Sequence, residues 1–311
     1  MFARFIPVLL LAGCAAAQTT QPTPQASRSA VLPTLENAGL SPDQFAEQCE
    51  AWDEWDKPAP PYRILGNSWY VGTCGITAIL IADPAGHILI DSGTAKGGEL
   101  VLANLRKLGV DPRDIRFLVA SHEHFDHVGG HALLKRETGA ELLSSAEAAE
   151  VFRTGKTAPD DPQFLSDHPD MTQVEPDRIV SDGETITLGD IALTAHATPG
   201  HTPGAMSWTW DACATPDAPP VCRRIAYVDS LSPISSDEYR FSDHPAYVAQ
   251  FRESLRKVAA LPCDIMLNPH PSASEGIERL EEHDSYYRCS RYAKMIGERL
   301  DERLAEEASG G

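Results

Sequence analysis

Apolar and polar positions follow one another along this chain in patterns that predict both strands and helices. Residues 77–82 and 87–90 are apolar and favour strands, and residues 83–86 between them, Asp-Pro-Ala-Gly, have the composition of a tight turn. We therefore expect a hairpin. The run 115–120 is mostly apolar, partly β-branched and follows a turn at residues 111–112, so it predicts a short buried strand.

Helical spacing recurs between the strands. In residues 98–108 the apolar side chains of Val101, Leu102, Leu105 and Leu108 fall on one face, and Gly109 provides a stop signal. Four more segments are predicted to be helical: the residues after Gly129, 146–153, 245–260 and 283–307. Because strands and helices alternate in both halves and no repeat occurs at solenoid or propeller spacing, we expect an α/β fold with a two-layer sheet core and outer helices.

Composition narrows the class of protein. A chain of 311 residues that is 42% apolar can bury one large core. Its net charge of −19 argues against nucleic acid as a partner. After the first residues, no segment reaches the roughly 20 consecutive apolar residues that a membrane-spanning helix needs.

The first residues resemble an export signal. Residues 1–4 contain a basic residue, residues 5–12 are apolar, and Leu-Ala-Gly-Cys at 11–14 resembles a bacterial lipobox. We expect a lipoprotein-type signal peptide over residues 1–13, cleavage before Cys14 and acylation of that cysteine. Ordinary secretory cleavage near Ala17, giving a freely soluble periplasmic protein, is the alternative.

The signal divides the rest of the chain in two. Residues 14–33, rich in Ala, Gln, Thr, Pro and Ser, predict a flexible lipid-anchored tether, and residues 34–311 predict the folded domain. Apart from Cys14 there are six cysteines, which in the oxidising periplasm suggest three disulfides. Cys213 and Cys222 enclose a Pro-rich loop, a natural local closure. The other four cysteines are Cys49, Cys74, Cys263 and Cys289.

The segment 121–130, Ser-His-Glu-His-Phe-Asp-His-Val-Gly-Gly, has the chemistry of a metal site. It directly follows the predicted strand 115–120, and the carboxyl ends of strands are the usual ligand sites of α/β sheets. His122 and His124 are two residues apart and can converge on one ion, whereas Asp126 and His127 are directed elsewhere. Imidazole and carboxylate ligands suit Zn²⁺, so this loop could serve two zinc ions.

Two other histidines stand in comparable settings. His201 lies in the Pro-Gly-His-Thr-Pro-Gly segment 199–204, and His270 lies between two prolines after the apolar segment 265–267. Prolines fix the backbone, as a preorganised ligand requires. The remaining histidines are interpreted as surface residues or as supports behind the ligands, with His131 and His196 the best candidates for support; the others are His87, His168, His244 and His283.

Taken together, these motifs resemble the metallo-β-lactamases, class B, subclass 3. The resemblance covers nearly the whole chain after residue 60, and it implies an αββα sandwich with a dinuclear zinc site at the edge of the two sheets. It rests on six segments in this order: Trp69–Thr73, Gly86–Gly93, His122–His127, Pro199–Gly204, Tyr227–Ser232 and Asn268–Ser272.

The resemblance also implies residue roles. The first zinc is held by His122, His124 and His201, and the second by Asp126, His127 and His270. Ser230 stands where other subclasses have a cysteine ligand, which agrees with the absence of cysteine between residues 222 and 263. Disulfide-bearing relatives favour two further cysteine pairs, Cys49 with Cys74 and Cys263 with Cys289.

The implied activity is zinc-dependent hydrolysis of the β-lactam amide bond by a hydroxide that bridges the ions. Asp126 orients this nucleophile, and Ser230 and Ser232 bind the substrate carboxylate unless they are ordinary turn hydroxyls. Penicillins, cephalosporins and carbapenems are the expected substrates, so the protein would confer antibiotic resistance. We expect a monomer whose only membrane contact is the lipid anchor.

Two alternatives and two loops remain open at this point. Thioesterases and lactonases of the glyoxalase-II type share the histidine motif but carry a bridging aspartate, and Asp229 could be that ligand. A non-catalytic periplasmic zinc-binding protein is the other alternative. Residues 154–182, which include Phe164, and residues 69–76 either form opposite walls of the zinc site or are plain surface.

Overall fold

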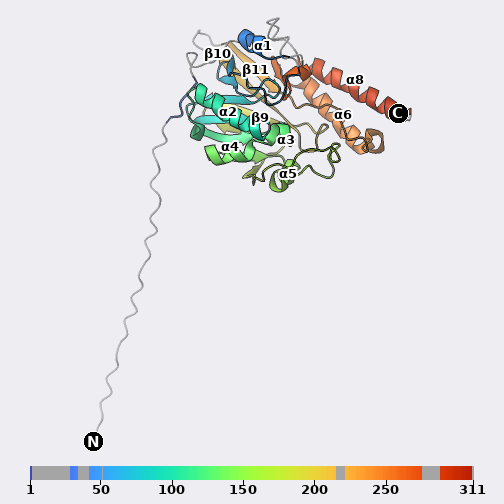
Figure 1. Cartoon of the computed structure of the whole chain (residues 1–311), viewed down its shortest axis with the longest axis horizontal. Helices are drawn as coiled ribbons and strands as arrows, with labels where there is room; N and C mark the ends of the chain where they lie inside the picture. The colour runs from blue at the N-terminus through green and yellow to red at the C-terminus, as the bar shows by residue number, and fades with distance from the viewer. Residues whose placement is uncertain (2–28, 34–41, 51, 215–220, 275–287, 310–311) are drawn as a thin grey trace.

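Two β-sheets pack face to face, and helices cover their outer faces (Figure 1). The structure is a computed structural model, which describes residues 1, 29–33, 42–50, 52–214, 221–274 and 288–309. The first sheet has the strand order β1-β2-β3-β4-β5-β6-β7 and the second has the order β12-β11-β10-β9-β8. This arrangement confirms the predicted αββα sandwich.

The first sheet changes from antiparallel to parallel pairing at β4. Strands β1 to β4 pair antiparallel, whereas β4 with β5, β5 with β6 and β6 with β7 are parallel. Its strands are β1 Tyr62–Leu65, β2 Ser68–Tyr70, β3 Ile79–Asp83, β4 Gly86–Ile90, β5 Ile115–Val119, β6 Glu141–Ser144 and β7 Arg178–Ile179. The predicted hairpin is β3 with β4, and the predicted third strand is β5.

The second sheet is antiparallel except for its edge strand β12, which runs parallel to β11. Its strands are β8 Thr185–Leu188, β9 Ile191–Ala197, β10 Met206–Ala214, β11 Val221–Tyr227 and β12 Ile265–Leu267. The carboxyl ends of β11 and β12 therefore lie side by side, which brings residues 228–232 close to residues 268–270.

Side-chain alternation along β3 explains why its sequence is apolar throughout. Ile79 and Ile81 point into the core between the sheets, where Trp208 and Trp210 of β10 also lie. Leu80, between them, points to the opposite face and joins a second core beneath the helices. A strand covered on both faces has no solvent-facing positions to fill with polar residues.

Helices cover both outer faces. The face of the first sheet is covered by α2 Ala95–Lys107, α4 His131–Thr138 and α5 Ala148–Thr154, and that of the second by α6 Pro245–Ala260 and α8 Cys289–Ala308. The other helical segments are α1 Pro42–Gln48, α3 Phe125–Val128 and the 3₁₀ turns η1 Pro112–Asp114, η2 Phe241–Asp243 and η3 Pro271–Ser274.

Helix boundaries differ from the predicted ones where capping decides them. The helix expected over 98–108 begins earlier, at Ala95, because the Thr94 side chain accepts a hydrogen bond from the Gly97 amide at 3.0 Å. Its end agrees with the prediction, since Gly109 has the left-handed φ of 74° that a glycine stop requires. The final helix begins at Cys289 in the described part of the chain, and residues 283–287 of the predicted helix lie outside it.

Three disulfides join Cys49 to Cys74, Cys213 to Cys222 and Cys263 to Cys289. The second links paired positions of β10 and β11, as the local closure predicts. The other two match the pairs that the family resemblance implies. Disulfides persist in oxidising compartments, so they indicate an extracytoplasmic protein.

The N-terminal segment contacts the domain earlier than expected. The Ala30 amide donates to the Pro84 carbonyl at 2.8 Å, and the Val31 amide donates to Asp114 Oδ2 at 3.1 Å. Residues 30 and 31 of the predicted flexible tether are therefore hydrogen-bonded to the domain, one to the β3-β4 turn and the other to η1. The predicted signal peptide, the acylation site Cys14 and the alternative cleavage near Ala17 lie outside the described residues.

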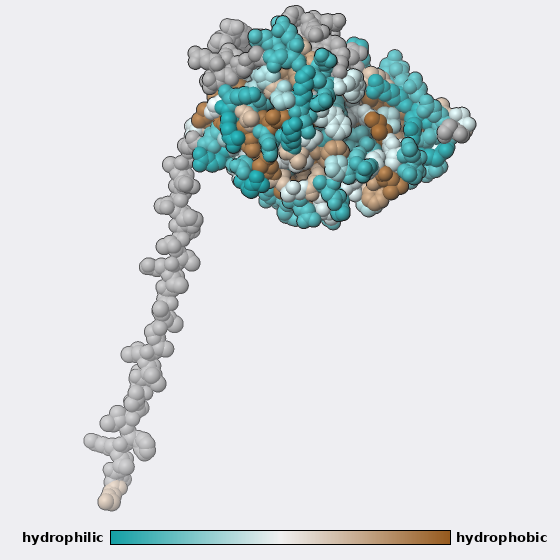
Figure 2. All heavy atoms as spheres, in the orientation of Figure 1, coloured by the Kyte–Doolittle hydropathy of each residue, from teal (hydrophilic) through white to brown (hydrophobic). Residues whose placement is uncertain are grey.

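The visible surface is mostly hydrophilic, with scattered apolar patches (Figure 2), in keeping with the net charge of −19. In the described part of the chain, no helix is long and apolar enough to cross a membrane.

Candidate metal centre

Hydrogen bonds to Asp91 hold the start of the predicted ligand loop, which follows the carboxyl end of β5. Asp91, just after β4, accepts hydrogen bonds from the Ser121 amide and hydroxyl, each at 2.7 Å, and from the Tyr227 hydroxyl at 2.6 Å. Asp91 has a left-handed φ of 59°, unusual for a residue with a side chain. The backbone of Asp91 is thus held in a costly conformation that fixes where the loop begins.

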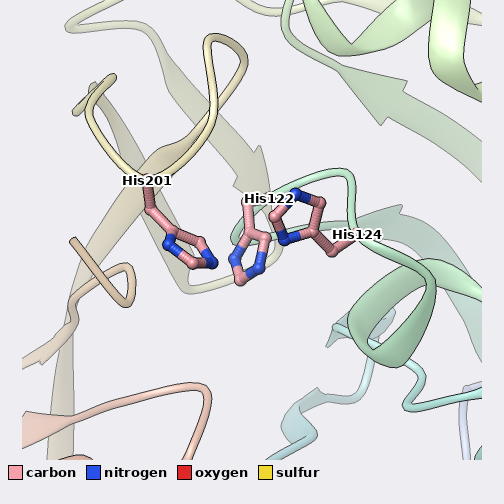
Figure 3. Close-up of side chains that lie close together, drawn as sticks. All are labelled: His122, His124 and His201. Atoms are coloured by element: carbon pink, nitrogen blue, oxygen red, sulfur yellow. The ribbon is translucent and has the colours of Figure 1, made fainter. Parts of the chain in front are cut away.

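Three histidines from two loops converge (Figure 3). His122 and His124 come from the loop after β5, and His201 comes from the loop between β9 and β10. All three are buried, and one ring nitrogen from each lies within 4.8 Å of the others. We call these residues the first histidine group.

Two members of this group hydrogen-bond to groups behind them. His122 Nδ1 donates to Asp229 Oδ1 at 2.8 Å, and His201 Nδ1 donates to the Ser232 carbonyl at 2.9 Å. Because a carbonyl can only accept, His201 carries its proton on Nδ1; His122 does so when Asp229 is ionised, a form that burial disfavours by raising the Asp229 pKa to about 7. His122 Nε2 is buried without any hydrogen-bond partner in the described structure, whereas His201 Nε2 has one long contact, at 3.5 Å, with the Gln163 amide nitrogen.

His124, the third member, is hydrogen-bonded through its other ring nitrogen, Nε2. His124 Nε2 donates to Asp161 Oδ2 at 3.0 Å, and both side chains are almost completely buried. Its Nδ1 is therefore the nitrogen with the free lone pair. An outer carboxylate that fixes a ligand imidazole in this way is typical of protein zinc sites.

The protonation of the first histidine group follows from its environment. Burial and the neighbouring imidazoles hold the pKa of His122 well below its usual value and lower that of His201 to about 3. Burial also opposes the charged form of His124, but the Asp161 carboxylate outweighs it and raises the pKa. Two of the three rings are therefore neutral at pH 7, the form that binds metal.

A second cluster of polar side chains adjoins the first, with Asp126 and His127 buried and His270 partly exposed. Asp126 Oδ2 lies 3.0 Å from His127 Nε2 and 3.4 Å from His270 Nε2, and the two Nε2 atoms are 3.1 Å apart. Possible ligand atoms of His122, Asp126 and His127 also lie within 4.8 Å of one another. We call Asp126, His127 and His270 the second ligand group.

Charge is concentrated in the second ligand group. Burial disfavours both charged forms, yet the attraction between Asp126 and His127 holds the pKa of Asp126 well below its usual value and, with help from Asp91, raises that of His127 to about 10. Burial lowers the pKa of His270 despite its contact with Asp126. A proton on His127 thus occupies the position where a cation would sit.

Close backbone packing requires glycine at two positions, Gly98 in α2 and Gly130 after the ligand loop. A Cβ on Gly130 would lie 2.7 Å from the Gly98 Cα, so α2 can approach the ligand loop only because both residues are glycines. His131 supports the loop from behind, as predicted: its Nδ1 lies 2.8 Å from Ser92 Oγ, and that hydroxyl donates to the His127 carbonyl at 2.9 Å.

Glu123, between two ligands of the first group, ties the two ligand loops together. Its carboxylate accepts hydrogen bonds from the Thr202 hydroxyl and the Gly204 amide, both at 2.8 Å. Burial raises its pKa to about 7. Glu123 could not be assigned a role from the sequence, because residue spacing does not show which neighbouring loop a side chain contacts.

Residues 156–170, which we call the overhang, cover the first histidine group. Its base is closed by a hydrogen bond from the Met171 amide to the Gly155 carbonyl at 2.8 Å. From it Asp161 reaches His124, the Gln163 amide nitrogen lies 3.5 Å from His201 Nε2, and the His168 ring lies 5.0 Å from that of His124. Within the predicted segment 154–182, residues 161–168 therefore form one wall of the site, and His168, expected to be an ordinary surface residue, belongs to it.

The opposite wall is not formed by residues 69–76. Trp69 is buried in the outer core beneath α2, where its ring packs in a cluster of apolar side chains. Trp55 takes the wall position instead, with its ring centroid 5.9 Å from that of His270 and 5.7 Å from that of Phe125. The 69–76 segment acts indirectly, since the Thr73 hydroxyl donates to the Trp55 carbonyl at 2.6 Å.

His196 does not support the ligands as predicted. Its Nε2 bonds with Thr209 Oγ1 at 2.9 Å across the β9-β10 pair, so its side chain serves the second sheet. His87 and His244 also lie elsewhere: His87 bonds to the Val31 carbonyl at 3.0 Å, and His244 stacks on Tyr239. His283 lies outside the described residues.

The two predicted substrate-binding serines follow β11 at the edge of the site. Ser230 Oγ is buried and has no hydrogen-bond partner within the described structure, whereas Ser232 Oγ lies 3.4 Å from the Ser230 carbonyl. Between them Leu231 has a left-handed φ of 47°, held by a hydrogen bond from its amide to Asp229 Oδ2 at 3.0 Å. The turn is strained at Leu231, and the Ser230 hydroxyl is buried beside it without a hydrogen-bond partner in the described structure.

Comparison with known proteins agrees with this geometry. A family model described as the metallo-β-lactamase superfamily matches residues 71–213. Among solved structures, the metallo-β-lactamase MIM-1 from Novosphingobium pentaromativorans is 47% identical with a TM-score of 0.81, over 86% of this chain and 98% of that one. MEM-A1, a subclass B3 metallo-β-lactamase from a soil metagenome library, is 38% identical with a TM-score of 0.77, over 83% of this chain and 100% of that one.

Curated relatives match over a shorter region. A probable metallo-hydrolase of Burkholderia pseudomallei is 31% identical over 44% of this chain and 48% of its own length, so this chain spans about half of that relative. The fold, the buried histidine and aspartate groups and these similarities lead to one conclusion. The chain belongs to the metallo-β-lactamase superfamily, and within it stands with the subclass B3 members.

Proposed function

We propose that this protein hydrolyses the amide bond of β-lactam antibiotics with two zinc ions. The observation that carries the proposal is the pair of adjoining ligand sets, one of three buried imidazoles and one of two imidazoles and a carboxylate, in which only His270 is partly exposed. Similarity to metallo-β-lactamases over most of the chain supports the substrate class. Penicillins, cephalosporins and carbapenems are the proposed substrates.

The residues present fit zinc. His122 Nε2 is a buried nitrogen with a free lone pair and no partner in the described structure, which is costly unless a cation binds it. The first histidine group would hold one ion and the second ligand group the other. When bound, Zn²⁺ lowers the pKa of water to about 7 and polarises a carbonyl group.

The chain's own residues supply the remaining functions. Asp126 orients the attacking water while it also serves as a ligand. Ser230, with its unpaired hydroxyl, and Ser232 hydrogen-bond the substrate carboxylate. The overhang and Trp55 enclose the substrate from two sides and exclude water. No side chain is proposed as a nucleophile, so no covalent enzyme intermediate forms.

Hydrolysis of thioesters or lactones with Asp229 as a bridging ligand is the competing function. Both oxygens of Asp229 are engaged, Oδ1 with His122 Nδ1 and Oδ2 with the Leu231 amide. In the described structure no hydrogen bond or ion pair joins Asp229 to the second ligand group. These contacts support a role for Asp229 behind His122 and favour the lactamase.

Turnover by purified protein tests the proposal. A chromogenic cephalosporin and a carbapenem are supplied with added zinc and then with a chelator, in parallel with a glutathione thioester and an acyl lactone. We expect chelator-sensitive cleavage of both lactams. Cleavage of only the thioester or lactone would support the competing function, and folded protein with two zinc ions and no turnover would support a non-catalytic zinc protein.

Export as a monomer anchored through an acylated Cys14 is proposed from the sequence. Labelling with palmitate that is lost in Cys14→Ala would support the anchor. An unmodified, freely soluble mature protein would point to ordinary cleavage near Ala17.

A further inference from the structure

The overhang has few attachments to the rest of the molecule. Residues 158–168 make three hydrogen bonds to the rest of the described chain: Asp161 to His124, Gln163 to His201, and the Pro162 carbonyl to the Ser236 amide. Two of the three therefore go to the first histidine group. The other hydrogen bonds of this segment are internal turns, such as the Phe164 amide to the Asp161 carbonyl.

Asp161 has the environment of a structural anchor. Its side chain is completely buried, and its two oxygens have separate tasks: Oδ2 accepts from His124 Nε2, and Oδ1 accepts from the Gln163 amide at 2.6 Å. The first bond orients a ligand imidazole. The second fixes the turn that carries Gln163. One carboxylate thus connects a ligand with the conformation of the overhang.

The outer part of the overhang is not held by packing. Phe164 and Leu165 are 43% and 60% exposed, although they follow the buried residues 161–163 directly. Lys156 and Asp170 form an exposed ion pair, which contributes little stability. Segments with few buried contacts open at low free-energy cost, and Gln163 contacts the same His201 nitrogen that a metal ion would use, so the bond between Asp161 and His124 carries much of what keeps the overhang closed when an ion is bound.

We propose that Asp161 is a positioning residue through which the first histidine group and the overhang stabilise each other. A cation at His124 Nδ1 fixes the position of the ring with its Nε2–H directed at Asp161 Oδ2 and so holds the overhang closed. The closed overhang in turn keeps the imidazole oriented and strengthens cation binding. Linkage requires both effects to have the same size. The inference rests on zinc binding by the first histidine group, as proposed above.

Hydrogen exchange of the full-length protein, with and without zinc, tests this coupling. In the wild type we expect zinc to slow amide exchange across residues 158–168. In Asp161→Asn, at saturating zinc, most of this zinc-dependent slowing should be lost. A purely structural role would speed exchange by the same factor with and without zinc. Asp160→Asn, a change at the neighbouring exposed carboxylate, is the matched control and should keep the wild-type response.

Zinc affinity is measured on the same proteins by competition with a chromophoric chelator. Loss of an outer carboxylate typically weakens metal binding roughly 10- to 100-fold, so we expect this loss for the ion of the first histidine group in Asp161→Asn and wild-type affinity in Asp160→Asn. The inference is overturned if zinc leaves exchange at residues 158–168 of the wild type unchanged, or if Asp161→Asn binds zinc as tightly as the wild type. A wild-type protein that binds no zinc would overturn the proposed function as well.

Discussion

The two ligand groups lie side by side but are held in different ways. Every imidazole of the first histidine group is fixed from behind, by Asp229, Asp161 or the Ser232 carbonyl. The side chains of the second ligand group mainly contact one another, at 3.0 to 3.4 Å. Within the described structure His127 Nδ1 has no hydrogen bond, and its nearest carboxylate oxygen, on Asp91, is 3.7 Å away.

The contrast teaches how one loop can serve two sites of different character. Ligands fixed by outer hydrogen bonds lose little conformational entropy when an ion binds, so the first histidine group is preorganised. In the second ligand group the side chains are held mainly by one another, and an ion must displace the proton on His127, as it must any proton that Asp161 stabilises on His124. We therefore expect the ion in the first histidine group to be bound more tightly.

Asp126→Asn should have the largest effect, because it removes the only carboxylate of the second ligand group. We expect kcat for a carbapenem to fall by at least roughly a hundredfold, while the far-ultraviolet circular dichroism and the tighter zinc ion are retained. Asp167→Asn, at an exposed position of the overhang, should behave as the wild type. Near-normal turnover in a folded, zinc-loaded Asp126→Asn protein would refute the role of Asp126.

Asp229→Asn should affect the first histidine group. Loss of the carboxylate behind His122 is expected to weaken the tighter zinc ion by roughly 10- to 100-fold, as measured by chelator competition, and to leave the weaker ion in place. Asp237→Asn, an exposed change on the same connection, is the control. If both ions are lost together, Asp229 is a bridging ligand and the distinction between the two groups fails.

The pH dependence of zinc binding should also differ between the groups. The pKa of His127 is about 10 in the zinc-free protein, and zinc binds only the neutral ring, so raising the pH from 7 removes the competing proton. The apparent affinity of the weaker ion should rise about tenfold per pH unit toward pH 10, as measured by chelator competition at pH 7, 8 and 9. An affinity of the weaker ion that does not change over this range would contradict the description of the second ligand group.

Ser230→Ala should have the smallest effect. Its hydroxyl is unpaired in the described structure, so removing it should not lower the melting temperature. Because a hydrogen bond to the substrate is lost, KM should rise by roughly two- to tenfold with little change in kcat. Unchanged kinetics would show that Ser230 is an ordinary turn residue.

The six proposed ligands could be singled out from the sequence because local signals mark them. His122 to His127 follow an apolar strand directly, and His201 and His270 lie between prolines that fix the backbone. The sheets were predictable for a similar reason, since β3, β4 and β5 are short apolar runs between turn residues.

The surroundings of the ligands could not be predicted in the same way. Asp161 lies 37 positions from His124 in a long polar segment, where nothing local distinguishes it from its neighbour Asp160. Nothing local indicates that Trp55 faces the site while Trp69 enters the core, because tertiary packing places both rings. Hydrogen bonds between distant segments depend on the folded chain, so residue spacing does not reveal them.

Zinc titration into metal-free protein tests the account most directly, with native mass spectrometry to count the ions and carbapenem hydrolysis followed in the same samples. We expect two ions to bind in sequence, the first at lower zinc concentration than the second, and the protein with both ions to cleave the carbapenem. Binding of a single ion, binding of two ions with equal affinity, or two bound ions without cleavage would contradict it.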